Sequence, residues 1–324
     1  MSMDITIGTS FRRILAPLVL AAALASAGAA NAQSSLAPIR IGTASSDLGA
    51  QVYYADDLGF FRNAGLQATI SPISGGPTIM AAVASGDLDI GWGNAIDATV
   101  AHQRGIPITI IATATIEDQS DPGTGILAVT NASGLKSAKD LDGKTIALLS
   151  LRNFTELATR NWVDKNGGDA KTVHFVEMPY SEMPAALQAG RIDAAVLDNT
   201  ADPTLGKPGD PLHVLSAVFF TVAPRLEGAV WYSTTTWVAA HRQQAKAFVA
   251  VMKQTALWAN AHHDDSATIL AAHISRTVDQ IRGSKRVIYG TDISPALVQP
   301  ELDLAFKYGL LSQPVQALEM ITNP

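Results

Sequence analysis

The sequence contains no cysteine, and this absence excludes several kinds of site at once. Disulfide scaffolds, thiolate zinc sites, iron–sulfur clusters and cysteine nucleophiles all require the thiol group. Charged residues are also scarce, at 16%, whereas hydrophobic residues make up 47% of the chain. A chain of this composition can bury a large core and is not disordered as a whole. At roughly 100–200 residues per domain, the 324 residues predict two domains.

Positive charge is in deficit, because 23 lysines and arginines face 29 aspartates and glutamates. The net charge of −6 argues against nucleic acid or an anionic membrane as a partner, since both require clustered cations. The chain has neither a GxSxG nor an HExxH motif. The histidines and aspartates at 262–265, with His273, lie at a polar helix end away from the expected site. We therefore predict no metal, no cofactor and no catalytic residue.

Long apolar runs are absent, and the longest one has another explanation. Arg12 and Arg13 precede an apolar run of 14 residues, at 14–27, and Ala30-Asn31-Ala32 follows. A positive segment, a short apolar segment and an A-x-A site are typical of a secretory signal peptide. The run is shorter than the ~20 residues that span a bilayer. We therefore predict cleavage after Ala32 and export to the periplasm as an acidic protein.

The segment after the signal peptide alternates strands with helices. Residues 39–43, 67–73 and 88–92 are rich in β-formers and predict three strands. A helix is expected over 50–63, and a second one from Pro77 to Gly86. Gly65 and Gly86 stand where a helix end accepts a left-handed residue. The order βαβαβ predicts a parallel sheet.

The same order returns about a hundred residues later, with strands at 145–149, 173–177 and 192–197 and helices at 155–165 and 182–189. Residues 81–91 (AAVASGDLDIG) match residues 185–195 (AALQAGRIDAA) at an offset of 104. Gly86 then corresponds to Gly190, and Asp89 to Asp193. A repeated unit of this length predicts two similar lobes.

The remaining segments connect these lobes. Residues 125–130 and 229–234 are isolated strands, which we interpret as crossings between the lobes. Helices follow residue 233 and are expected to pack back on the first lobe. The predicted organisation is a signal peptide at 1–32, the first lobe at 33–126 and 229–324, and the second lobe at 127–228.

Ligands of open parallel sheets bind beyond the carboxyl ends of the strands. Six loops leave those ends, and several precede helices, whose free N–H groups favour anions. Their hydroxyl groups add donors, and the Ser74-Gly75-Gly76-Pro77 turn lets a ligand approach the backbone but lacks the lysine of a P-loop. The loops cover residues 43–49, 74–78, 93–97, 150–154, 178–181 and 198–201.

Charged and aromatic residues of these loops indicate alternative solutes. Arg152 is the only cation in them and could hold a carboxylate, sulfonate or phosphate. Asp97 and Asp198 could instead hold an amine. Phe154 and Tyr180 could stack on a planar ligand, although such side chains more often belong to a core.

Four segments carry a resemblance to a known family: 56–70 (DDLGFFRNAGLQATI), 81–112, 133–148 (SGLKSAKDLDGKTIAL) and 185–203. They resemble the periplasmic substrate-binding proteins of ABC importers, in particular the nitrate/sulfonate/taurine and NMT1/THI5-like group. The resemblance implies a type II periplasmic-binding fold of class α/β, with two βαβ lobes around a cleft and two hinge crossings. The predicted ligand contacts are Ser45, Ser46, Gln51, Ser74, Gly75, Gly76, Thr78, Asn94, Asp97, Ser150, Arg152, Asn153, Phe154, Tyr180 and Asp198.

The resemblance also implies a function. A small anionic or planar solute would be captured by hinge closure and delivered to a membrane permease and its ATPase, by a monomer that is not an enzyme. The alternatives are a binding protein for a pyrimidine precursor of thiamine, a solute-sensing module for a membrane receptor, and a periplasmic enzyme. The enzymes of the family carry a cysteine-rich motif, which this chain lacks.

Overall fold

The computed structural model describes residues 1–2, 36–73, 75–120, 124–197, 205 and 208–324. The predicted signal peptide from residue 3 onward and two of the predicted contacts, Ser74 and Asp198, lie outside the described residues. Residues Leu36–Pro324 form one compact unit. Within the described ranges, no helix is both long enough and apolar enough to cross a bilayer.

The first sheet has six strands in the order β11-β4-β10-β3-β1-β2. β1, β2 and β3 are parallel, whereas β10 runs antiparallel to both β3 and β4. The predicted parallel βαβαβ unit is thus confirmed. The strand bounds are β1 Ala37–Thr43, β2 Leu66–Pro72, β3 Ile90–Gly93, β4 Ile108–Asp118, β10 Arg225–Thr234 and β11 Ile288–Tyr289.

The second sheet has five strands in the order β7-β6-β8-β5-β9. β6, β7 and β8 are parallel, as predicted, and β5 is antiparallel to β8 and β9. Sequence analysis did not predict β4, β9 or β11. The bounds are β5 Ile126–Thr130, β6 Thr145–Leu148, β7 His174–Glu177, β8 Ala194–Leu197 and β9 Leu212–Ala217.

The two segments that we interpreted as crossings are strands inside the sheets. β5 lies wholly in the second sheet, and β10 lies in the first from Arg225 onward. The chain therefore changes sheets just before each strand, and the boundary expected at residues 228 and 229 falls inside β10. Both strands are almost wholly buried, because each has a neighbour on both sides.

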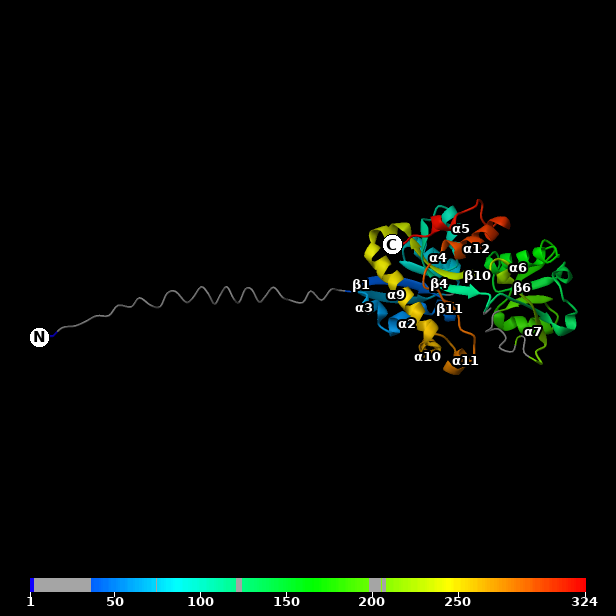
Figure 1. Cartoon of the computed structure of the whole chain (residues 1–324), viewed down its shortest axis with the longest axis horizontal. Coiled ribbons are helices and arrows are strands. Elements are labelled where there is room, and N and C mark those ends of the chain that lie inside the picture. Colours follow the sequence, from blue (N-terminus) through cyan, green and yellow to red (C-terminus); the bar gives the residue numbers. More distant parts are fainter. Residues whose placement is uncertain (3–35, 74, 121–123, 198–204, 206–207) are drawn as a thin grey trace. The chain divides into compact units, whose positions relative to one another are not determined.

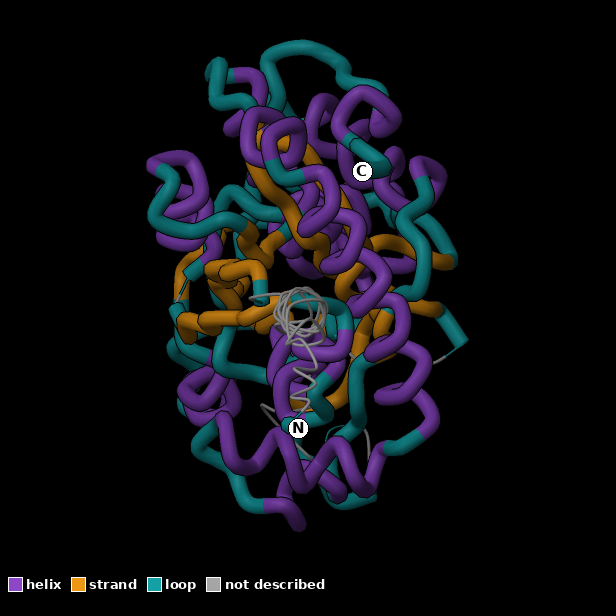
Figure 2. The backbone as a smooth tube through the Cα atoms, turned by 90° about the vertical axis from the view of Figure 1, so that its left-hand side faces the viewer, coloured by secondary structure: helices purple, strands orange, loops and turns teal. Residues whose placement is uncertain are grey.

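Helices cover both sides of the strands (Figure 2). The helix expected over 50–63 is two helices, because Gly59 between them has a φ of 72°. The helices are α2 Gln51–Asp57, α3 Phe60–Asn63, α4 Gly76–Ser85, α5 Ala95–Gln103, α6 Phe154–Lys165, α7 Met183–Gln188, α8 Thr235–Ala240, α9 Arg242–Ala261, α10 His263–His273, α11 Val278–Arg282, α12 Pro295–Lys307 and α13 Ala317–Met320, with 3-10 turns η1 Asp47–Gly49, η2 Asn131–Ser133, η3 Ala138–Leu141, η4 Tyr180–Glu182 and η5 Val218–Thr221.

The internal repeat is visible in its hydrogen bonds. An Asp89 carboxylate oxygen accepts the backbone N–H of Arg40 at 2.8 Å, and Asp193 accepts that of Thr145 at the same distance. Each aspartate also pairs with a cation, Asp89 with Arg40 of β1 at 2.5 Å and Asp193 with Lys144 just before β6 at 3.5 Å. The repeated aspartate therefore ties the start of the third strand of each unit to its first strand.

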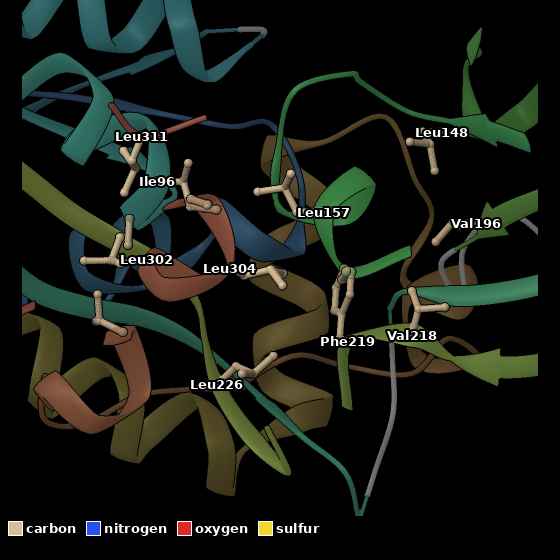
Figure 3. Close-up of a cluster of buried hydrophobic side chains, with 14 of the residues drawn as sticks. Ile96, Leu148, Leu157, Val196, Val218, Phe219, Leu226, Leu302, Leu304 and Leu311 are labelled. Atoms are coloured by element: carbon tan, nitrogen blue, oxygen red, sulfur yellow. The ribbon is translucent and has the colours of Figure 1, made fainter. Parts of the chain in front are cut away.

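The C-terminal helices pack on the first sheet, as predicted. The apolar face of α9 covers one side together with α2, and α12 lies against β10 and α5 on the other (Figure 1). One apolar cluster continues from this side into the second sheet, where Leu304 of α12 and Leu157 of α6 both belong to it (Figure 3). At the same contact, Lys307 donates to Asn161 at 3.0 Å and Tyr308 to Asp164 at 2.6 Å.

Candidate functional site

The predicted site loops leave the carboxyl ends of parallel strands. β1, β2 and β3 run in one direction in the first sheet, and β6, β7 and β8 do so in the second. The loops after each set consequently begin at one edge of their sheet. This edge is where ligands of such sheets bind.

Two loops of the first sheet lie side by side. Asn94 caps α5 by accepting the N–H of Asp97 at 2.7 Å, and its amide donates to the Asp97 carboxylate at 2.8 Å. A Cβ atom at Gly76 would lie 3.5 Å from that carboxylate. Burial raises the pKa of Asp97, and the hydrogen bond from Asn94 opposes this. Gly75 and Thr78 are exposed at the start of α4 beside them.

The corresponding loop of the second sheet presents a cation. Asn153 caps α6 by accepting the N–H of Glu156 at 3.2 Å, and Glu156 accepts the N–H of Arg152 at 2.7 Å. Arg152 itself has a φ of 56° and is exposed. Its guanidinium makes no hydrogen bond or ion pair with any residue that the structure describes, so it is available to an anion.

The aromatic candidates of the second sheet contact the core. The rings of Phe154 and Phe219 lie 4.8 Å apart, and Tyr180 packs against the cluster of Met183 on α7. Both rings are half-buried. Ser150, in the loop between β6 and α6, is half-buried as well. Both rings therefore contribute to the packing of the second sheet with its helices.

Gln51 has a structural role in place of the predicted one. Its side chain is 0% exposed, so no solute can reach it. Its amide donates to the carbonyl of Met252 at 2.8 Å, and its oxygen accepts the indole N–H of Trp231 at 2.8 Å. The residue thus ties α2 to α9 and β10. Its position in the sequence, next to a site loop, gave no sign of these long-range contacts.

A pocket of about 750 Å³ opens at the same edge of the first sheet. Ser45 and Ser46 line it, as predicted for the loop after β1, but the other predicted contacts do not. Its remaining wall comes from the end of β4, from Thr124 and from the segment 270–288, which we had assigned only to packing. The apolar part of the wall consists of Leu48, Ile116, Leu270, Ile274, Ile281, Val287 and Ile288.

Charged side chains of both signs line this pocket. Arg276 donates to the carbonyl of Gln280 at 3.2 Å and has no carboxylate partner among the described residues. Glu117 and Lys285 both line the pocket. Burial raises the pKa of Glu117 to about 7, although the positive charge of Lys285 lowers it. The pocket therefore joins hydroxyl donors, cations and an apolar surface.

A third cation of the pocket is already engaged. Arg286 donates to both carboxylate oxygens of Asp47, at 2.8 and 2.9 Å, and to the hydroxyl of Tyr54 at 2.7 Å. Tyr289 donates to the backbone carbonyl of Asp47 at 2.5 Å. This network fixes the segment 286–289 to the turn after β1, so that the hydroxyls and the cations keep their relative positions.

Sequence analysis missed these cations, although a signal was present. Four of the 23 cationic side chains fall within eleven residues, as Arg276, Arg282, Lys285 and Arg286. Nothing local indicated that this segment lies beside the loop after β1, which is about 240 residues earlier. The repeated βαβαβ unit predicted ligand contacts only in the six loops.

Comparison with known proteins connects this architecture to a family. The family model described as NMT1/THI5 like matches residues 49–266. The chain belongs to this family. It is 29% identical over 202 residues to the taurine-binding periplasmic protein of Escherichia coli (strain K12), a match that covers 61% of this chain and 59% of that relative, less than two thirds of its length.

Solved structures share the fold. The periplasmic aliphatic sulphonate binding protein SsuA of Escherichia coli superposes with a TM-score of 0.70 at 17% identity, covering 89% of this chain and 92% of that chain. The desulfurization enzyme DszB does so with a TM-score of 0.60 at 14% identity, covering 89% and 96%. The periplasmic-binding-protein fold expected from the sequence is thus confirmed, and the fold by itself is compatible with binding and with catalysis.

Proposed function

We propose that this protein is an exported solute-binding protein that captures a small organic anion and delivers it to a membrane permease of the ABC type. The observation that carries the proposal is the pocket at the carboxyl edge of the first sheet. It brings Arg276, without a carboxylate partner among the described residues, to the hydroxyls of Ser45 and Ser46. Membership of the family and the taurine-binding relative support the same conclusion.

The walls of the pocket favour an anion with an apolar body. A guanidinium can hold a sulfonate or carboxylate by two parallel hydrogen bonds. Isoleucine and leucine side chains around it gain from the burial of apolar solute surface. We place the anionic group at Arg276 and the serine hydroxyls, and the apolar part against Ile274 and Ile281. Arg152 and the loops of the second sheet would then close over the solute.

Calorimetric titration with methane-, ethane- and butanesulfonate tests this proposal. We expect affinity to rise with chain length, by up to about 0.8 kcal/mol for each buried methylene. Arg276→Ala should weaken binding by about ten- to a hundredfold, because a charge-assisted hydrogen bond contributes roughly 1.5–3 kcal/mol. Arg282→Ala is the matched control, since Arg282 lies on the same segment and pairs with Asp264 at 3.3 Å outside the pocket.

The other solute classes have distinct outcomes in the same experiment. If the solute is nitrate, the affinity for the alkanesulfonates should not rise with their chain length. A pyrimidine that binds where every sulfonate fails would overturn the anion assignment. An Arg276→Ala variant with wild-type affinity would show that the solute does not bind in this pocket. Product formed in excess of protein, detected by mass spectrometry, would show that the protein is an enzyme.

A further inference from the structure

Three glutamates lie together beside the two strands through which the chain leaves and re-enters the first sheet. Glu117 is next to the end of β4, Glu227 is near the start of β10, and Glu301 is on α12, which packs on β10. In the ladder between the strands, Glu227 pairs with Ile116, the neighbour of Glu117. The three carboxyl groups are close enough that the charges of Glu227 and Glu117 both raise the pKa of Glu301.

Two of these side chains are almost completely buried. Glu227 is 1% exposed and Glu301 is 2% exposed. One carboxyl oxygen of Glu227 accepts the hydroxyl of Thr113, while the other is buried without a hydrogen-bond partner among the described residues. Neither side chain forms an ion pair in the part of the chain that the structure describes. Burying an unpaired carboxylate is strongly unfavourable, so both groups are held in the neutral form.

The surroundings raise the pKa of each of the three groups. Burial raises the pKa of Glu117 to about 7 and that of Glu227 to about 8. Burial raises the pKa of Glu301 well above its usual range. The cations that oppose these shifts are Lys285 in the pocket wall and Arg225 on β10, of which Arg225 also faces Asp118 at 3.5 Å. Of the three, Glu117 lines the pocket, whereas Glu227 and Glu301 are almost completely buried.

We propose that Glu117, Glu227 and Glu301 form a proton-holding cluster, in which Glu117 makes solute binding in the pocket depend on pH and the buried pair makes the packing of α12 on β10 depend on pH. For the pocket, this rests on the proposed function. An anion beside Glu117 favours the neutral carboxyl group, so binding takes up a proton where free Glu117 is ionised. Affinity therefore falls as the pH rises through the pKa of Glu117.

The buried pair has a consequence that needs no solute. The unfolded chain releases these protons near the ordinary glutamate pKa of 4.5, whereas the folded chain keeps them. Between these values the folded state binds more protons, so the free energy of unfolding falls with rising pH. This loss continues through the folded pKa of Glu227 and on toward that of Glu301. Ionisation would introduce like charges between β10 and α12 and loosen the helix that also contacts α6.

Butane-1-sulfonate is the probe for the pocket, because a sulfonate does not titrate in this range. The affinity of the wild type should fall between pH about 6 and 8.5, by at most about tenfold per pH unit for one linked proton. Titrations in buffers of different ionisation enthalpy should show proton uptake on binding. Glu117→Gln should show neither effect. A wild-type affinity that is independent of pH, or an unchanged pH dependence in Glu117→Gln, would overturn the coupling.

Unfolding by denaturant without any solute tests the buried pair separately. The wild type should lose stability over the same pH range, and Glu301→Gln and Glu227→Gln should each lose less. Glu319→Gln, an exposed glutamate of α13, is the matched control and should behave as the wild type. Infrared spectra at neutral pH should show protonated carboxyl groups whose signal falls in Glu301→Gln. If butane-1-sulfonate fails to bind, the proposed function fails, whereas equal pH profiles for wild type and both buried variants overturn the cluster itself.

Discussion

At the scale of single residues, polar side chains near the site loops divide into caps, buried ties and free groups. Asn94 and Asn153 both cap the helices that follow their strands. Gln51 is a buried tie between elements. Arg152 and Arg276 keep guanidinium donors without carboxylate partners among the described residues. Residue type and loop position predicted Gln51, Asn94, Asn153 and Arg152 equally as ligand contacts and did not predict Arg276, so only the contacts in the structure separate these roles.

Gln51→Ala is expected to lower stability without changing affinity. The substitution leaves the indole N–H of Trp231 unpaired in the core, whereas the carbonyl of Met252 loses one hydrogen bond but stays inside helix α9. An unsatisfied buried group costs about 1–3 kcal/mol, so the free energy of unfolding should fall by about that amount. Denaturant unfolding measures this loss, and calorimetry on the folded variant measures solute affinity.

The control for Gln51 is Gln243→Ala, at an exposed position of α9. Its free energy of unfolding should stay within about 0.5 kcal/mol of the wild type. A Gln51→Ala protein that folds with wild-type stability but binds its solute weakly would restore the original assignment of Gln51 as a ligand contact.

At the scale of elements, the turn between β6 and α6 combines a backbone constraint with a free cation. Arg152 occupies the left-handed region, and its N–H is held by Glu156 in the first turn of the helix. Glu156 is itself held by Arg160 at 2.8 Å. The turn is thereby fixed by the helix that it begins, and the guanidinium of Arg152 projects from a rigid position.

Comparing Arg152→Gly with Arg152→Ala separates these two properties. Both variants remove the cation, and both should weaken solute binding by about ten- to a hundredfold if Arg152 forms a second charge-assisted contact with the anion as the second sheet closes over the solute held at Arg276. Only the glycine relieves the left-handed backbone, so only Arg152→Gly should gain stability, by up to about 1 kcal/mol after the entropy of glycine in the unfolded chain. Thermal unfolding and calorimetry give the two readouts. Wild-type affinity in both variants would show that Arg152 is a solvated surface residue.

At the scale of the whole molecule, two chain crossings and one packed contact join the sheets. The crossings precede β5 and β10, and Gly125 before β5 has a φ of 67° against the ring of Phe219. The contact of α12 with α6 adds the pairs Lys307–Asn161 and Tyr308–Asp164. Few covalent and polar links therefore have to adjust if the second sheet moves toward the pocket.

Solute binding should change the radius of gyration in solution. The sequence hypothesis places the hinges near residues 123–130 and 223–233. Because β5 and β10 belong to the sheets, we expect each sheet with its helices to move as a rigid body about the crossings just before these two strands. Small-angle scattering with and without a saturating alkanesulfonate measures the change. Identical scattering for the free protein and the saturated complex would contradict closure.

The sequence alone determined the two parallel βαβαβ units, because strand and helix periodicity, the glycine caps and the repeated Gly–Asp pair are local signals. The repeat aligns Asp89 with Asp193, and in the structure both carboxylates accept a backbone N–H of the first strand of their unit. It also placed Ser45 and Ser46 at the edge where the pocket opens, since strand ends fix which loops meet there.

Only the tertiary structure decided the rest. β5 and β10 read as isolated strands because antiparallel insertion between distant neighbours leaves no local pattern. Arg276, Lys285 and Glu117 reach one pocket from segments up to 168 residues apart in the sequence, and the three glutamates meet from β4, β10 and α12. Burial, which separates Gln51 from a ligand contact and gives Glu227 its proton, depends on packing over the whole unit. The sequence specifies the functional group of each side chain, whereas the neighbours that folding brings to it decide what that group can do.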